Sequence, residues 1–164
     1  GFTLVRDTKP LDICALPTPL ELVATVIHPK IEVKTADARA LLKKSISLKK
    51  AITQWGNVGA LVSSLYEENY ELLSRSLVDV IVEPARSMLI PYFKEFKAAC
   101  EAGGALGSGI SGSGPSVFAL SKGMSTANKV AQAMGSVLEK TKIPYDIYVS
   151  PVKKTGVSFI EDIT

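Results

Sequence analysis

Four short segments of the chain combine apolar and β-branched residues in the pattern that is typical of β-strands. They cover residues 2–5, 21–28, 116–120 and 145–150. Residues 10–19, between the first two segments, include three prolines, which predicts a loop that connects two bodies of structure. The pattern therefore places one strand apart from the other three.

The clearest helical pattern begins after Ser47, a residue type that favours the N-cap position. From there, residues recur at intervals of three or four, as the buried face of a helix requires; they are Leu48, Ile52, Trp55, Gly59 and Val62. We expect this stripe, with Trp55, to pack in the core. Gly56 and Gly59 each cost a helix about 1 kcal/mol relative to alanine. Their small size predicts either the close approach of another backbone or ordinary dense packing.

Further helices are marked by residues that start or restart them. Thr35 has the side chain of an N-cap residue, and Asn69 is placed to cap a short helix. Pro84 suits the first turn of a helix, and Pro91 is expected to kink or restart that helix. Residues 125–141 form an amphipathic pattern with one apolar side.

From residue 21 onward the predicted order is strand, helices, strand, turn, strand, helix, strand. This order corresponds to a split βαββαβ unit with extra helices in its first crossover. The predicted fold class is therefore α+β, a sandwich of helices on a sheet.

Composition narrows the function classes. The chain has 164 residues with a net charge of +3, and its lysines are spread along the sequence, so charge gives no support for a nucleic-acid or membrane-surface partner. No apolar run approaches the roughly 18 residues of a membrane span. Cys14 and Cys100 share no metal-ligand spacing with His28, so we expect reduced thiols, a cytoplasmic protein and no metal site. Cys100 falls on an apolar helix stripe and is expected in the core, whereas His28 is expected to be structural.

The chain opens in a β-like run without Met and without a signal-type leader. We interpret this opening as the result of a removed leader or as a sign that the chain is a piece of a longer protein.

Glycine is concentrated in one segment, since six of the 12 glycines lie between residues 103 and 114. A dinucleotide-binding motif is excluded because a strand follows the glycines and position 132 is Gln132. A Walker A loop is excluded because the segment has no lysine, and the partner motifs of a protein kinase are absent from the sequence. What remains is a turn between strands whose N–H groups could attract an anion, or a flexible hairpin without a ligand.

Residues 105–117 (Ala-Leu-Gly-Ser-Gly-Ile-Ser-Gly-Ser-Gly-Pro-Ser-Val) resemble the third conserved motif of the GHMP small-molecule kinases. Residues 35–39 (Thr-Ala-Asp-Ala-Arg) and 83–86 (Glu-Pro-Ala-Arg), the latter followed by Ile-Pro at 90–91, are similar to signatures of the homoserine kinase branch. The resemblance covers essentially the whole chain. It implies transfer of the γ-phosphoryl group of ATP, with Mg²⁺, to the hydroxyl of L-homoserine in threonine biosynthesis.

The resemblance also implies a domain division. Residues 1–19 would be the last strand and linker of an N-terminal GHMP domain, and residues 20–164 would be the C-terminal domain, which is ferredoxin-like in this family. The ATP loop of the family, Pro-x-x-x-Gly-Leu-Gly-Ser-Ser-Ala, does not occur in the sequence. ATP and Mg²⁺ would therefore be bound mainly by the missing N-terminal half, and the chain alone would bind substrate without turning it over. The sequence leaves undecided whether the protein forms a homodimer.

The site residues follow from the same resemblance. Arg39 and Arg86 would clamp the carboxylate of homoserine, because guanidinium groups bind carboxylates through paired hydrogen bonds, and Thr35 would contact the substrate. A glycine-serine loop would shape the phosphate and substrate region, and its members are Gly107, Gly109, Ser111, Gly112, Ser113 and Gly114. Neither a dedicated catalytic base nor a metal ligand is expected in this chain.

Three alternatives accompany this hypothesis. Arg39 and Arg86 could instead be surface residues that pair with Asp37 and Glu83. Asp79 and Glu83 could form a carboxylate pair, although solvated or arginine-paired acids are commoner. At the level of function, the chain could be a stand-alone amino-acid-binding module of ferredoxin-like fold, or part of another GHMP kinase that acts on mevalonate or a sugar.

Overall fold

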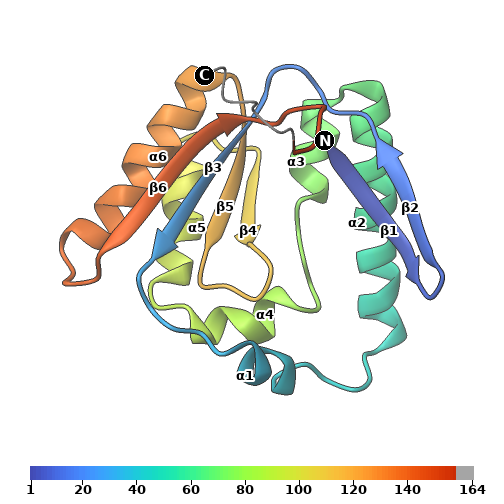
Figure 1. Ribbon diagram of the computed structural model, residues 1–164, viewed down its shortest axis with the longest axis horizontal. Helices are drawn as coiled ribbons and strands as arrows, with labels where there is room; N and C mark the ends of the chain where they lie inside the picture. The colour runs from blue at the N-terminus through green and yellow to red at the C-terminus, as the bar shows by residue number, and fades with distance from the viewer. Residues whose placement is uncertain (158–164) are drawn as a thin grey trace, which may run out of the picture.

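Four antiparallel strands form the central sheet of the computed structural model, which describes residues 1–157. In spatial order they are β4 (Gly107–Ile110), β5 (Val117–Lys122), β3 (Leu22–Pro29) and β6 (Tyr145–Pro151) (Figure 1). The helices between β3 and β4, and the single helix between β5 and β6, complete the split βαββαβ order. The α+β fold predicted from the sequence is confirmed, and residues 158–164 of the predicted domain lie outside the described part.

Two helices cover one face of this sheet. They are α5 (Phe93–Ala102) and α6 (Met124–Glu139), which lie side by side against the sheet (Figure 1). Their apolar stripes meet the inward side chains of β3 and β5. Cys100 is 1% exposed in this core, as predicted, and its burial raises the pKa of the thiol although a hydrogen bond with Ser108 acts in the opposite direction.

A second, smaller core lies under α2 (Leu48–Glu67) and α3 (Tyr70–Ser76). Both predicted caps are confirmed, because the side chains of Ser47 and Asn69 accept hydrogen bonds from N–H groups in the first turns of these helices. The buried residues of this core are Leu22, Leu65, Leu73 and Leu120. It joins α2 and α3 to one end of the sheet.

Two very short helices lie near the connection from β3 to α2 (Figure 1). They are α1 (Thr35–Ala40) and α4 (Glu83–Arg86), and a 3-10 turn, η1 (Ser87–Leu89), follows α4. The prediction that Thr35 caps its helix is wrong, since Lys34 occupies the N-cap position of α1 and makes no side-chain cap bond. Pro84 lies in the first turn of α4, as predicted.

The N-terminal region is a hairpin and not a single strand with a loop. The first strand, β1 (Phe2–Thr8), pairs antiparallel with β2 (Leu11–Leu16). The predicted connector over 10–19 is therefore wrong for its first part, because the prolines there flank a strand without interrupting it. In β2 more and less exposed residues alternate, which is the period of a strand with one covered face.

The apolar stripe of α2 is exposed, which contradicts its predicted place in the core. Leu48, Ile52 and Trp55 are 68%, 56% and 64% exposed. A Cβ added at Gly56 or Gly59 would have no atom within 4 Å, so no backbone approaches these glycines in the described part of the chain. The helical period was predicted correctly, but its apolar side faces away from this domain.

No helix within residues 1–157 is long and apolar enough to cross a membrane.

Candidate functional site

Arg86 connects three segments that are distant in sequence. It is the last residue of α4, where its Nε donates to the carbonyl of Ala38 in α1 at 3.3 Å. One of its Nη groups donates to the carbonyl of Gly112 at 3.0 Å. The structure thus brings together the three segments that carry the predicted site motifs.

Thr35 and Arg39 lie on α1, next to the residue that Arg86 contacts. Both residues are exposed, and within residues 1–157 neither side chain makes a hydrogen bond or an ion pair. Within residues 1–157 no ion pair joins Arg86 to Glu83, and the carboxylate of Glu83 pairs with Lys97 instead. The alternative in which Arg86 is a surface partner of Glu83 is therefore wrong.

The first half of the predicted glycine-serine loop is a strand. Gly107 and Gly109 belong to β4, where a Cβ on Gly107 would lie 2.5 Å from the Cβ of Leu77. A Cβ on Gly109 would lie 3.1 Å from the ring of Phe118 and 3.2 Å from a carboxylate oxygen of Glu83. These two glycines permit close packing, and the prediction that they form part of a loop is corrected.

The true turn covers residues 111–116, between β4 and β5. The N–H of Ser111 donates to the carbonyl of Ser116, and the N–H of Gly114 donates to the carbonyl of Ser111. These two N–H groups are used inside the turn and do not point to a ligand. Gly112 has φ +62° and open space around it, so the turn can be approached at this residue, whereas a Cβ on Gly114 would meet Ile90.

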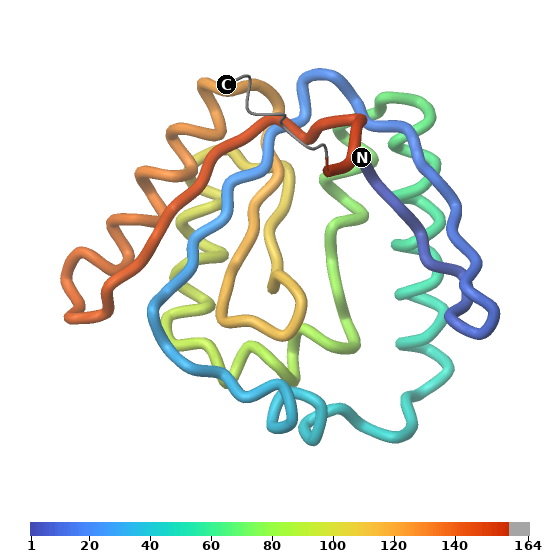
Figure 2. Tube along the Cα trace, in the orientation of Figure 1, coloured from blue at the N-terminus to red at the C-terminus, as the bar shows by residue number. Residues whose placement is uncertain are grey.

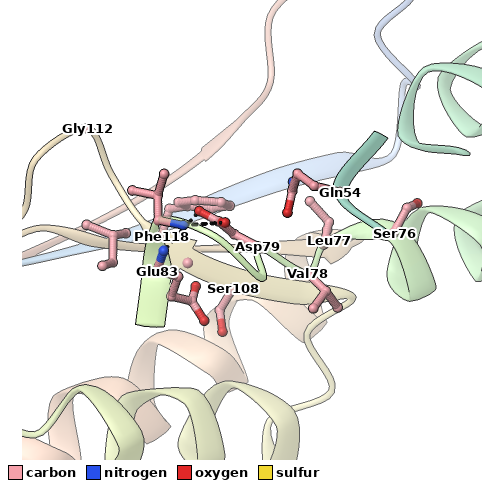
Figure 3. Close-up of a pocket in the computed structure, with 12 residues that line it drawn as sticks. Gln54, Ser76, Leu77, Val78, Asp79, Glu83, Ser108, Gly112 and Phe118 are labelled. Atoms are coloured by element: carbon pink, nitrogen blue, oxygen red, sulfur yellow. Dashed lines mark hydrogen bonds between the residues drawn. The ribbon is translucent and has the colours of Figure 1, made fainter. Parts of the chain in front are cut away.

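A pocket of about 230 Å³ lies beside this turn. Figure 3 shows Asp79, Glu83 and Gln54 at this pocket together with Gly112 and Ser108. Polar residues of this lining, among them Asp79, Glu83 and Gln54, stand beside apolar side chains such as those of Leu77, Val78 and Phe118. The residues of this lining do not include the predicted trio on α1 and α4.

Asp79 holds the start of α4. Its carboxylate accepts hydrogen bonds from the backbone N–H groups of Ile81, Val82 and Glu83 at 2.8, 2.8 and 3.0 Å, one of which is drawn in Figure 3. The sequence pattern does not reveal this role, because it favours a solvated or arginine-paired acid at Asp79 over half of a carboxylate pair. Asp79 lies three residues before Val82, the N-cap residue of α4. Aspartate side chains commonly accept a hydrogen bond from the backbone N–H two residues further on, a signal that could have identified this role.

Lys97 is the second residue that the sequence analysis missed. It extends from α5 and lies 3.2 Å from a carboxylate oxygen of Glu83, and its ammonium donates to the carbonyl of Ser108 at 2.6 Å. Its position on the polar side of an amphipathic helix gave no signal of this role. The polar residue His28 makes a hydrogen bond through Nδ1 with Ser116 at 2.8 Å, which supports its structural interpretation.

Comparison with known proteins identifies the class. The model of the family described as GHMP kinases C terminal matches residues 57–140, and the chain belongs to this family.

Within this class the chain is similar to homoserine kinases. It is 50% identical to the homoserine kinase of Chlorobium phaeobacteroides (strain BS1) over 98% of this chain and 51% of that protein. It is 47% identical to that of Chloroherpeton thalassium over 95% of this chain and 49% of that protein. The crystal structure of homoserine kinase from Cytophaga hutchinsonii superposes with a TM-score of 0.93 at 52% identity, covering 95% of this chain and 50% of that one. The chain spans about half the length of the relatives it matches.

Proposed function

We propose that this chain is the substrate-binding C-terminal part of a cytoplasmic homoserine kinase, which transfers the γ-phosphoryl group of ATP to the hydroxyl of L-homoserine. The observation that carries the proposal is the pair of hydrogen bonds by which Arg86 joins α1 to the glycine turn. The similarity to proteins named homoserine kinases extends over nearly the whole chain and supports the same substrate.

The substrate would bind between α1 and the turn. Arg86 uses Nε and one Nη group on backbone carbonyls, and its second Nη group is left to bind a carboxylate, as guanidinium donors do. Arg39, which is exposed on α1, would supply the second cation, and Thr35 would contact the substrate. Gly112 would border the bound substrate because no side chain occupies the space beside it.

ATP and Mg²⁺ would be bound mainly by an N-terminal half of the same protein. Within the described residues, no group of three or more His, Cys, Asp or Glu side chains could hold a metal ion. Asp79 and Glu83, the acids at the pocket, are already engaged by backbone N–H groups and by Lys97. The residues present therefore do not fit a magnesium site. Phosphoryl transfer depends on positioning and on charge stabilisation, and this chain would supply the positioning of the acceptor.

The N-terminal half would also cover exposed apolar surface. The hairpin β1–β2 lies beside α2 (Figure 2), and both present apolar side chains to the outside. The exposed residues include Val5, Ile13, Leu48, Ile52 and Trp55. We assign residues 1–19 to the body that this half would form and residues 20–164 to the C-terminal domain.

The test is phosphorylation of L-homoserine by Mg-ATP. We expect the full-length kinase to turn over homoserine, this chain alone to show no turnover, and addition of the separately produced N-terminal half to restore it. In the full-length kinase, Arg86→Ala should raise the KM for homoserine at least about thirtyfold, because the carboxylate would lose a half-buried cationic partner. Arg75→Ala, at an exposed position on α3, is the matched control.

Two results would contradict the proposal. One is turnover of mevalonate or a sugar in preference to homoserine by the full-length kinase. The other is homoserine binding by this chain, measured by calorimetry, together with no phosphorylated product from two folded halves with Mg-ATP, which is the behaviour of an amino-acid-binding module.

A further inference from the structure

The helix that carries Arg86 cannot hold its own position. It has four residues, and a single helical turn is not stable without other contacts. The segment before it, residues 77–82, has no regular secondary structure. The direction of Arg86 toward the carbonyls of Ala38 and Gly112 must therefore be fixed by side chains that contact α4.

Glu83, at the other end of the same turn, could attract the guanidinium of Arg86 in competition with the carbonyls of Ala38 and Gly112. The two residues are three positions apart on α4, a spacing at which opposite charges on a helix attract each other. The side chain of Glu83 is only 18% exposed and lies against Gly109 of β4. A carboxylate with so little access to water is stabilised by a cationic partner.

Lys97 supplies that partner from a rigid element. Its side chain is 34% exposed, and it extends from α5, which is anchored in the core by Phe93, Phe96 and Cys100. The ammonium group contacts both the carboxylate of Glu83 and the carbonyl of Ser108. It thereby connects α4, α5 and β4.

We propose that Lys97 is a positioning residue for Arg86. Its ion pair with Glu83 holds that carboxylate beside β4 and prevents it from drawing the guanidinium of Arg86 away from the glycine turn. This inference rests on the proposed function, in which Arg86 binds the carboxylate of homoserine. Lys97 itself does not touch the substrate. Its effect is transmitted through Glu83 and α4.

The kinetic test uses the full-length kinase. Lys97→Met should raise the KM for homoserine about tenfold with kcat within about threefold, a change equivalent to about 1.4 kcal/mol of binding free energy. Lys97→Arg should keep the KM near the wild-type value, because arginine can donate to both Glu83 and the carbonyl of Ser108. Lys94→Met, on an exposed position of the same helix, should leave both constants unchanged.

The decisive variant is Lys97→Met combined with Glu83→Gln. If Lys97 acts by restraining Glu83, removal of the competing charge should return the KM to within about threefold of the wild-type value. A double variant as impaired as Lys97→Met would overturn the proposal. Thermal unfolding of each variant verifies that a rise in KM does not come from loss of the fold.

A second measurement separates this inference from the proposed function. In this chain, the NMR signal of the Arg86 Nε–H should exchange faster with solvent in Lys97→Met than in Lys94→Met, because its hydrogen bond to Ala38 is lost. Equal exchange in the two variants would overturn the positioning role. Failure of the wild-type kinase to phosphorylate homoserine would instead refute the proposed function and leave the exchange result valid.

Discussion

Asp79 shows how one side chain can define the start of a helix that is too short to stabilise itself. Its two carboxylate oxygens satisfy three backbone N–H groups that α4 and the segment before it cannot pair internally. Because these groups are partly buried, water replaces the lost acceptor poorly. The free energy of unfolding should therefore depend strongly on this carboxylate.

We expect Asp79→Ala to lower the free energy of unfolding by about 2 kcal/mol, because three partly buried N–H groups would lose a charged acceptor. Asp79→Asn should cost less, because the amide oxygen can still accept the bonds that Oδ1 accepts. Asp37→Ala is the control, since Asp37 is exposed in the first turn of α1. Denaturant unfolding of this chain measures all three, and equal midpoints for Asp79→Ala and Asp37→Ala would refute the stabilising role of Asp79.

Residue types on their own identified the site only in part. Arg86 was predicted from a resemblance, and the structure places it against Ala38 and Gly112. Its carboxylate-binding role remains a prediction. Lys97 could not be predicted, because a lysine on the polar side of a helix has the same pattern whether it faces solvent or bridges two other elements.

At the scale of elements, the glycines fall into two physical groups. Gly107 in β4 allows Leu77 to approach the strand, and an added Cβ would lie 2.5 Å from the Leu77 Cβ. A Cβ added at Gly56 in α2 would meet no atom within 4 Å. The first glycine is required by packing, whereas the second only lowers the stability of its helix.

Replacing glycine by alanine should therefore have opposite effects on stability at these two positions. Gly107→Ala should destabilise this chain by about 1–3 kcal/mol through overpacking against Leu77. Gly56→Ala should stabilise it by up to about 1 kcal/mol through helix propensity. Thermal unfolding compares the two variants, and a shift of the same sign in both would contradict this distinction.

The same distinction explains which elements could be predicted from the sequence. Helices with a regular apolar period, such as α2 after its cap at Ser47 and α6, are predicted correctly, and the predicted range 125–141 lies close to the observed bounds of α6. Glycine content indicates backbone freedom and does not reveal a neighbour such as Leu77, so it predicts a loop where the structure has β4. Prolines on both sides of β2 predict a connector in place of this strand.

At the scale of the whole molecule, the apolar stripe of α2 is exposed although its pattern is that of a buried helix face. A helical period of apolar residues predicts that a helix face is buried but not which body buries it. Trp55 at the centre of this stripe is exposed here. Under the proposed function the covering body is the N-terminal half, so the sequence pattern described an interface outside this domain.

This assignment gives a prediction for Trp55, the single tryptophan of the chain. Addition of the N-terminal half should move its fluorescence emission to shorter wavelength, because the indole leaves water. Trp55→Lys should leave the stability of this chain nearly unchanged but weaken the binding of the N-terminal half by about thirtyfold or more, as the loss of a central tryptophan does at interfaces. Gln132→Lys, on the exposed side of α6, should bind like the wild type. If Trp55→Lys binds as tightly as Gln132→Lys, the stripe on α2 is not the surface that joins the two halves, and the kinase must assemble through another face of this domain.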